Sequence, residues 1–264
     1  MDLELRGRRA LVTGSTAGIG LATATLLAQE GASVTVNGRT QPRVDAAIAQ
    51  IRTAVPDASC SGIAADLSSA PGCEALIRQL PDVDILVNNL GIFEPKAFEE
   101  ISDADWLRFF DANVMSGVRL SRAYLPGMRK RNWGRIVFVS SESALQIPPE
   151  MVHYGMTKTA ELAIARGIAE TTAKTGITVN SVLPGPTASE GVSKFVAQMA
   201  QAEGIEPATM ERQFFAAARP SSLLRRFAKP EEVASMIVYV CSARASATNG
   251  AALRVDGGVV RAIG

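Results

Sequence analysis

The stretch RALVTGSTAGIG, residues 9–20, decides the fold. Its first four residues form the short apolar run that is typical of a buried strand. The glycines at positions 14, 18 and 20 permit a tight turn, a close backbone approach to a pyrophosphate, and close packing of a helix on the strand. The N-terminus of that helix would offer free N–H groups and a partial positive charge to phosphates. The stretch predicts a dinucleotide-binding unit, with a plain strand-to-helix turn as the alternative.

Six further apolar runs alternate with longer helical patterns along the rest of the chain. The runs span 33–36, 60–65, 83–87, 135–139, 177–182 and 251–255, and the helical patterns include 18–30, 103–130, 154–175 and 230–243. Near-continuous apolar strands indicate burial on both faces, as in a parallel sheet covered by helices. We therefore predict an α/β fold: a single doubly wound Rossmann domain over residues 1–264, with about seven parallel strands and helices on both faces.

One segment, residues 187–226, contains no strand pattern. It is expected to form two short helices, at 190–203 and 207–218, with Gly204 between them. Such an insertion is typical of a substrate lid, although an ordinary helical connection is the alternative. Its apolar residues can either cover an apolar substrate or dock the lid helices; they are Val192, Phe195, Val196, Met199, Met210, Phe214 and Phe215.

The composition excludes several classes of function. A net charge of +1 provides no field that would attract nucleic acid or anionic lipid. No run of 18 uncharged apolar residues occurs, so no membrane span is expected. The three cysteines lack CxxC spacing, which argues against a disulfide framework or a metal site and favours the cytoplasm. The expected partner is a small-molecule substrate.

The end of the second predicted strand bears on the choice of dinucleotide. The chain reads Asn37-Gly38-Arg39-Thr40 there, and no acid that could accept from ribose hydroxyls occurs between residues 33 and 40. Arg39 offers a cation to a 2′-phosphate instead, which favours NADP(H). A solvated surface arginine is the other interpretation, so NAD(H) stays open.

Polar residues follow the fourth and fifth predicted strands and start the helical pattern near residue 154. Tyr154 and Lys158 are four residues apart, so they share one helix face. An adjacent ammonium and a nicotinamide cation should lower the tyrosine pKa toward about 7. Ser141 follows the fifth strand, and the segment Asn88-Asn89-Leu90-Gly91 follows the fourth, at the sheet edge where ligands bind.

Along almost its whole length the chain resembles the short-chain dehydrogenase/reductase family, because several motifs occur in the family's order and spacing. Ser141 lies thirteen residues before Tyr154, as is usual in the family. The other matches are TGxxxGIG at residues 13–20, the acidic Asp66 before Leu67, NNAG at residues 88–91 with Leu90 replacing alanine, and NxxxPG from Asn180 to Gly185.

The resemblance implies a role for each matching residue. Tyr154 would transfer the proton, Ser141 would stabilise the substrate oxygen, Lys158 would hold the nicotinamide ribose, and Asn113 would orient a water. Ser189 stands where the family usually has threonine. The residues expected to bind the cofactor are Gly14, Ser15, Thr16, Gly18, Ile19, Gly20, Arg39, Asp66, Leu67, Asn89, Gly91, Tyr154, Lys158, Pro184, Gly185, Thr187 and Ser189.

The resulting prediction is an NADP(H)-dependent carbonyl reductase, of the 3-oxoacyl type. The alternatives are an NAD-dependent alcohol or sugar dehydrogenase and a non-catalytic dinucleotide sensor. His153, the single histidine, is interpreted as a pocket-wall or structural residue. The resemblance also implies a homotetramer, or a homodimer, formed through the helices near 103–130 and 154–175.

Overall fold

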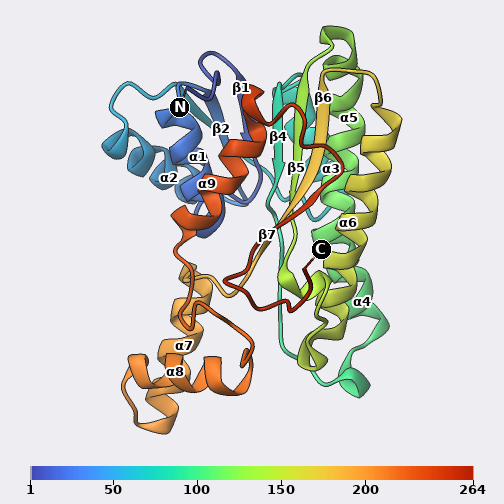
Figure 1. The fold of residues 1–264 in the computed structure, drawn as a ribbon. Coiled ribbons are helices and arrows are strands. Elements are labelled where there is room, and N and C mark those ends of the chain that lie inside the picture. The colour runs from blue at the N-terminus through green and yellow to red at the C-terminus, as the bar shows by residue number, and fades with distance from the viewer. Residues whose placement is uncertain (1, 264) are drawn as a thin grey trace.

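The computed structural model describes residues 2–263, except for the side chains of Lys194, Phe195, Gln198 and Ala202. The proposed lid residue Phe195 therefore lies outside the described side chains. Seven parallel strands form one sheet in the order β3-β2-β1-β4-β5-β6-β7 (Figure 1). They are β1 (Arg9–Val12), β2 (Ser33–Gly38), β3 (Cys60–Ala64), β4 (Ile85–Asn88), β5 (Gly134–Val139), β6 (Ile177–Pro184) and β7 (Ala252–Val255). This architecture confirms the predicted fold class.

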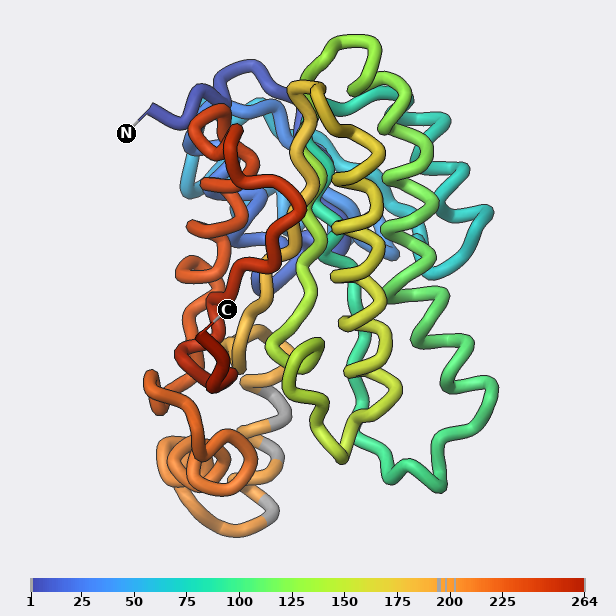
Figure 2. The backbone as a smooth tube through the Cα atoms, turned by 45° about the vertical axis from the view of Figure 1, so that its right-hand side comes forward, coloured from blue at the N-terminus to red at the C-terminus, as the bar shows by residue number. Residues whose placement is uncertain are grey.

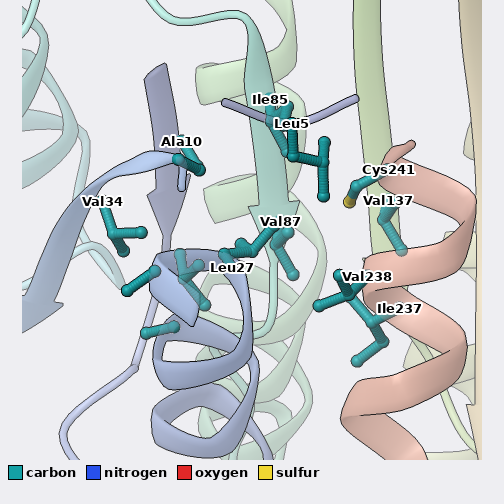
Figure 3. Packing of buried hydrophobic residues seen from close by; sticks show 14 of the residues in the cluster. Leu5, Ala10, Leu27, Val34, Ile85, Val87, Val137, Ile237, Val238 and Cys241 are labelled. Atoms are coloured by element: carbon teal, nitrogen blue, oxygen red, sulfur yellow. The ribbon is translucent and has the colours of Figure 1, made fainter. Parts of the chain in front are cut away.

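Helices cover both faces of the sheet, and a separate apolar cluster lies under each layer. The first cluster packs β-strand side chains against α1 (Gly18–Gln29), α2 (Gln41–Ala54) and α9 (Pro230–Cys241). Figure 3 shows part of it, with Val87 and Val137 from the sheet, Leu27 from α1, and Ile237 from α9. The second cluster joins the other face to α3 (Ala70–Gln79), α5 (Ser116–Arg131) and α6 (Val152–Thr171).

The strand order places a crossover point between β1 and β4. The chain runs outward from β1 through β2 to β3, then returns to pair β4 on the other side of β1. In open α/β sheets ligands bind at the carboxyl ends of strands at such a point. The loops that follow β1 and β4 carry the glycine stretch and the Asn88–Gly91 turn, so both lie at this point.

The helical pattern predicted at 103–130 is helical throughout, from residue 103 to residue 131, but it is not α-helical along its whole length. It comprises α4 (Asp103–Phe109), a π-helical turn η2 (Phe110–Met115), and α5. A π turn carries one additional residue per turn without ending the helix, so the apolar spacing continues through it. Such turns occur frequently at functional sites, and this one carries Asn113.

The segment after β6 forms α7 (Glu190–Glu203) and α8 (Pro207–Ala217), which lie beyond the carboxyl end of the sheet (Figures 1 and 2). Val196, Ala200 and Met210 form an apolar cluster within this segment, away from the two sheet clusters. A backbone bridge between Thr187 and Ala228 joins the two ends of the segment. Among residues 2–263, no helix combines the length and hydrophobicity needed to cross a bilayer.

Candidate active site

The glycine loop between β1 and α1 has backbone angles that favour glycine. Gly14 and Gly18 have φ angles of 58° and 55°, which are left-handed values. A Cβ at Gly20 would lie 2.5 Å from Asn89 Nδ2 and 2.7 Å from the Gly14 carbonyl oxygen. The loop therefore needs a glycine at position 20 so that the Asn89 side chain can approach it.

Asn89 and Ser15 support the loop from below. The Asn89 amide donates to the carbonyl oxygens of Thr13, at 2.9 Å, and Gly14, at 3.1 Å. Ser15 is fully buried, its hydroxyl donates to Val12 O at 2.6 Å, and its N–H donates to the Asn37 carbonyl. Both residues were predicted to bind the cofactor, which stays a prediction, and in the structure their side chains shape the loop.

At the adenosine end of the predicted cofactor site, Arg39 is exposed and forms no side-chain hydrogen bond or ion pair with any other described residue. Asp66 is tied into a turn, since its carboxylate accepts from the Ser68 N–H and hydroxyl. Leu67 is buried in the second apolar cluster, which leaves only its backbone for a ligand. Sequence reasoning missed Arg43, a second cation one turn into α2, which pairs with Glu190 at 3.1 Å.

Ser141 and Tyr154 meet at the carboxyl end of β5. Ser141 follows β5 and begins a 3-10 turn by accepting the Ser143 N–H at 3.1 Å. Tyr154 lies in the first turn of α6, half-buried, with the exposed ring of Phe93 edge-on at 6.4 Å between centroids. The two predicted catalytic residues are therefore brought together, and Ser141 is close enough for its side chain to act on the pKa of Tyr154, in the lowering direction.

Lys158 is buried beside Tyr154, but its strongest partner is an acid that was not predicted. Its Nζ lies 3.0 Å from Glu161 Oε1 and 3.2 Å from Oε2, and donates to the Val139 carbonyl at 3.0 Å. A Cβ on Gly91 would lie 3.3 Å from this Nζ, so the ammonium lies directly beneath the Asn88–Gly91 turn. Glu161 had no motif to mark it, because an acid in a helical pattern is usually a solvated residue.

The electrostatics of the pair differ from the sequence expectation. Burial raises the pKa of Tyr154, and the opposing effects of the Lys158 charge and the Ser141 hydrogen bond do not overcome it. Burial also raises the pKa of Glu161 to about 7. Burial disfavours the Lys158 ammonium, but the adjacent Glu161 carboxylate outweighs that effect and raises the pKa of Lys158. The predicted lowering of the tyrosine pKa is absent from the protein alone.

Asn113 holds two parts of the site together. Its amide donates to the Ile92 carbonyl at 3.0 Å and to Thr157 Oγ1 at 2.9 Å, and its Oδ1 accepts the Ile92 N–H at 2.8 Å. The Thr157 hydroxyl in turn donates to the Tyr154 carbonyl at 2.7 Å. The π turn thus links the loop after β4 to α6. All hydrogen-bonding groups of the Asn113 amide except one lone pair serve this link, so its side chain has little capacity left for a water.

The segment after β6 reaches back over the glycine loop. Pro184 ends β6, and Gly185 packs on the Asp256 backbone, where a Cβ would lie 2.5 Å from the Asp256 oxygen. Thr187 donates to the Gly185 carbonyl at 2.9 Å, and Ser189 caps α7. A Cβ on Gly18 would lie 3.2 Å from Ser189 Cβ, so the start of the lid segment contacts the predicted phosphate loop.

Glu142, next to Ser141, is neither solvated nor a free pocket-wall residue. It is buried, its Oε1 accepts from Arg219 Nε at 2.8 Å, and its Oε2 accepts from the Ser143 hydroxyl at 2.7 Å. Arg219 comes from the segment that leaves α8. This buried ion pair joins the loop of the candidate catalytic serine to the far end of the lid segment, and no sequence motif predicts it.

Two other predicted features have a structural explanation. His153 is fully buried, its ring centroid lies 4.0 Å from that of Phe109, and burial lowers its pKa, so it is a neutral packing residue. In the lid segment, Val196, Met210 and Phe215 are buried, with Met210 and Val196 packed together and Phe215 against Phe227. These residues therefore form the core of the segment itself.

Comparisons with known proteins agree with this arrangement. The sequence profile of the short chain dehydrogenase family matches residues 8–200. The uncharacterized oxidoreductase YvaG of Bacillus subtilis is 46% identical over the full length of both chains. D-beta-hydroxybutyrate dehydrogenase of Cupriavidus necator is 35% identical over 97% of this chain and 99% of its own.

Among solved structures, L-sorbose reductase of Gluconobacter frateurii, complexed with NADPH and L-sorbose, superposes with a TM-score of 0.94. It is 30% identical, and the superposition covers 100% of both chains. The glycine crossover, the paired Ser141 and Tyr154, and these matches lead to one conclusion. The chain belongs to the short chain dehydrogenase family and is an NAD(P)-dependent oxidoreductase that binds a nicotinamide dinucleotide and acts on a small molecule.

Proposed function

We propose that the chain is an NADPH-dependent reductase of small or medium-sized ketones, of the 3-oxoacyl type. The observation that carries this proposal is the meeting of Ser141 and Tyr154 at the carboxyl end of β5, one strand away from the β1–β4 crossover. A phenol and a second hydroxyl that lie this close together can both contact one carbonyl oxygen of a substrate. This is the geometry required for proton transfer to a ketone.

The residues present fit a dinucleotide. The left-handed glycines 14 and 18 let the loop turn tightly against Leu90 and Ser189, and they place it at the N-terminus of α1, whose free N–H groups suit a pyrophosphate. Arg39, exposed and without a partner among the described residues, suits a 2′-phosphate, and Arg43 provides a second cation in the first turn of α2. Thr16, Ile19, Gly91 and Gly185 complete the proposed contacts, mainly through their backbone.

Once bound, the dinucleotide supplies the hydride, and the protein supplies the proton and the geometry. Tyr154 Oη donates its proton to the carbonyl oxygen as the alcohol forms, while the Ser141 hydroxyl donates a hydrogen bond to the same oxygen. Lys158 Nζ lies beneath the Asn88–Gly91 turn, and it would contact the nicotinamide ribose by giving up one of its three contacts with Glu161 and Val139 O. Asn113 keeps α6 and the loop after β4 in register.

The substrate class rests on relatives and on the lid segment. One relative is named for D-beta-hydroxybutyrate, whose oxidised form is a 3-oxo acid, and this favours 3-oxo compounds. A solved neighbour reduces L-sorbose, so a sugar ketone is the second candidate. A non-catalytic sensor has no need for the Ser141–Tyr154 pair. A cytoplasmic location stays a prediction, supported by three buried and unpaired cysteines.

A substrate screen tests the proposal directly. The purified protein is supplied with NADPH and, in parallel, with NADH, and cofactor oxidation is followed with acetoacetyl esters and with keto sugars. We expect turnover of an acetoacetyl ester with NADPH at least about tenfold faster than with NADH, since a phosphate–arginine contact contributes roughly 1.5–3 kcal/mol. Faster reaction with keto sugars would favour the second candidate, and a large NADH preference would remove Arg39 from its role.

Arg39→Ala and Arg43→Ala separate the two candidate phosphate ligands. Arg39→Ala should raise the KM for NADPH by about tenfold or more and leave the KM for NADH unchanged. Arg78→Ala on α3, on the opposite face of the sheet, is the matched control. An equal effect on both cofactors would mean that Arg39 only supports the fold.

A further inference from the structure

Glu161 places a second buried charge behind the candidate catalytic pair. It lies one turn after Lys158 on α6, and the side chains of Lys158 and Glu161 are only 4% and 2% exposed. Both Glu161 carboxylate oxygens lie within 3.2 Å of Lys158 Nζ. A buried charge is stable only when it is paired, so each of these groups accounts for the presence of the other.

The surroundings of this pair contain few other charges. On α6, the ring of Tyr154 has its centroid 5.8 Å from Lys158 Nζ. From β5 and the loop after it, the pair meets the Ser140 hydroxyl and the Val139 carbonyl, while Glu142 adds a negative charge on the Tyr154 side. Glu142 is itself neutralised by Arg219. Among the described side chains, Lys158 is therefore the cation whose charge acts on the phenol, and Glu161 is its direct counter-ion.

We propose that Glu161 is a positioning residue that cancels the charge of Lys158 and so keeps the Tyr154 phenol protonated, ready to donate its proton to a ketone. This inference rests on the proposed function. Without Glu161, the ammonium charge would favour phenolate, the form that accepts a proton from an alcohol. With Glu161, the site holds the form that reduction requires. The raised pKa of Tyr154 agrees with this assignment.

The test measures the ionisation of Tyr154 and needs no substrate. The chain has three tyrosines, so the ultraviolet difference spectrum of phenolate can be assigned by subtracting the titration of Tyr154→Phe. In Glu161→Gln the shape is retained and the charge is lost. The Tyr154 titration should then move down by about one pH unit or more, as expected for removing one charge a few ångströms away at an effective dielectric constant near 20.

Two further variants control for simple structural damage. Glu161→Asp restores the charge and should return the titration toward that of the wild type. Glu170→Gln removes an acid from the exposed side of the same helix, where it pairs only with Arg166, and should leave the titration unchanged. If Glu161→Gln does not fold, the wild type still decides, because the proposal requires its Tyr154 to stay protonated up to a pH near 10, the ordinary tyrosine value.

An unchanged Tyr154 titration in folded Glu161→Gln would overturn the proposal, as would phenolate in the wild type at neutral pH. These results are independent of ketone turnover. If the titration shifts as expected but no ketone is reduced, the proposed function fails and the role of Glu161 as counter-ion stands. If ketones are reduced and the titration does not shift, only the inference on Glu161 fails.

Discussion

At the scale of single residues, a hydroxyl and two charged groups surround Tyr154, and burial determines how strongly they act on its pKa. Tyr154 is half-buried between the Ser141 hydroxyl and the Lys158 ammonium, and Glu161 lies behind that ammonium. In such an environment a charge acts over several ångströms with little screening by water. The proposed proton transfer at Tyr154 Oη therefore depends on Lys158 and Glu161 as well as on the groups that would contact the substrate.

Tyr154→Phe removes the proton donor and leaves the ring that packs near Phe93. We expect ketone reduction to fall by at least about 100-fold, the lower range for loss of a general acid. NADPH affinity, measured by fluorescence titration, should change by less than about threefold, because most of the proposed cofactor contacts are made by backbone groups. Tyr239→Phe on the exposed side of α9 is the control. Retained turnover in Tyr154→Phe would exclude this residue as the donor.

The sequence predicts where residues that directly follow a strand lie, because the carboxyl ends of parallel strands share one edge of the sheet. Ser141 and Tyr154 meet as their spacing implied. It could not predict which side chains turn inward: Ser15 and Asn89 occupy motif positions but bond within the fold. Glu161 could not be predicted either, since its burial depends on how α6 packs against β5.

At the scale of elements, the lid segment is joined to the rest of the molecule by few contacts. Its start lies over Gly18, α7 is linked to α2 through Arg43 and Glu190, and its end is held by Arg219 against Glu142. The Arg43–Glu190 pair is exposed and contributes little, whereas the Arg219–Glu142 pair is buried. Arg219 therefore attaches the segment through a buried ion pair, next to the backbone hydrogen bonds that Leu223 and Leu224 donate to Gly257.

Arg219→Met keeps the length of the side chain but leaves the Glu142 carboxylate buried without a partner. We expect the free energy of unfolding to fall by about 3 kcal/mol, as for other broken buried pairs. Cleavage between residues 187 and 226 in limited proteolysis should become faster. In the double variant with Glu142→Gln most of the stability should return, which tests the pairing itself. Arg212→Met on the exposed side of α8 serves as control.

A methyl group at Gly20 tests the brace between the glycine loop and Asn89. Gly20→Ala would place its Cβ within 2.5 Å of Asn89 Nδ2, so either the loop or the amide must move. The expected cost in urea unfolding is about 1–3 kcal/mol, with a loss of dinucleotide affinity measured by calorimetry. Ala22→Ser, a small change on the same helix, should alter neither. Unchanged affinity in Gly20→Ala would show that the loop tolerates displacement.

At the scale of the whole molecule, each end of the sheet carries an acid with a shifted pKa, and the two pKa shifts have opposite directions. At the amino end, hydrogen bonds and charge from Arg9 outweigh burial and lower the pKa of Asp84, so its stabilising contribution is lost as the pH falls. At the carboxyl end, burial raises the pKa of Glu161 to about 7, against an ordinary value of 4.5. Its contribution has the opposite sign: the folded state holds this proton more tightly, and that advantage is lost as the pH rises through 7.

The Glu161 titration predicts a difference in stability between two proteins as the pH changes. Going from pH 4.5 to pH 7, wild-type protein should lose on the order of 3 kcal/mol relative to Glu161→Gln, which has no proton to release at this position. Urea unfolding at several pH values measures this difference. A constant difference between the two proteins would mean that the Glu161 carboxyl titrates as it does in the unfolded chain.

The outer face of α6 is the basis for a prediction on assembly. Of the small residues on α6, Ala165 and Ala169 are buried against the sheet, whereas Ala163 and Gly167 are exposed on the outer face. Nothing lies within 4 Å of a Cβ added at Gly167, so a second helix could approach closely. We expect a homotetramer or homodimer in light scattering, and a smaller species for Gly167→Glu. Gln50→Glu on α2 is the control, and a monomeric wild type would contradict the prediction.

The small apolar cluster inside α7 and α8 has a practical consequence. Because Val196, Ala200 and Met210 pack against one another, the segment does not need the sheet clusters for its own packing. The surface residues of the lid segment can therefore be substituted, or the segment can be exchanged for that of a relative, while the apolar clusters of the sheet stay intact. A graft at the Thr187–Ala228 junction would then vary the lid segment alone, provided that Arg219 is kept as the buried partner of Glu142 beside Ser141.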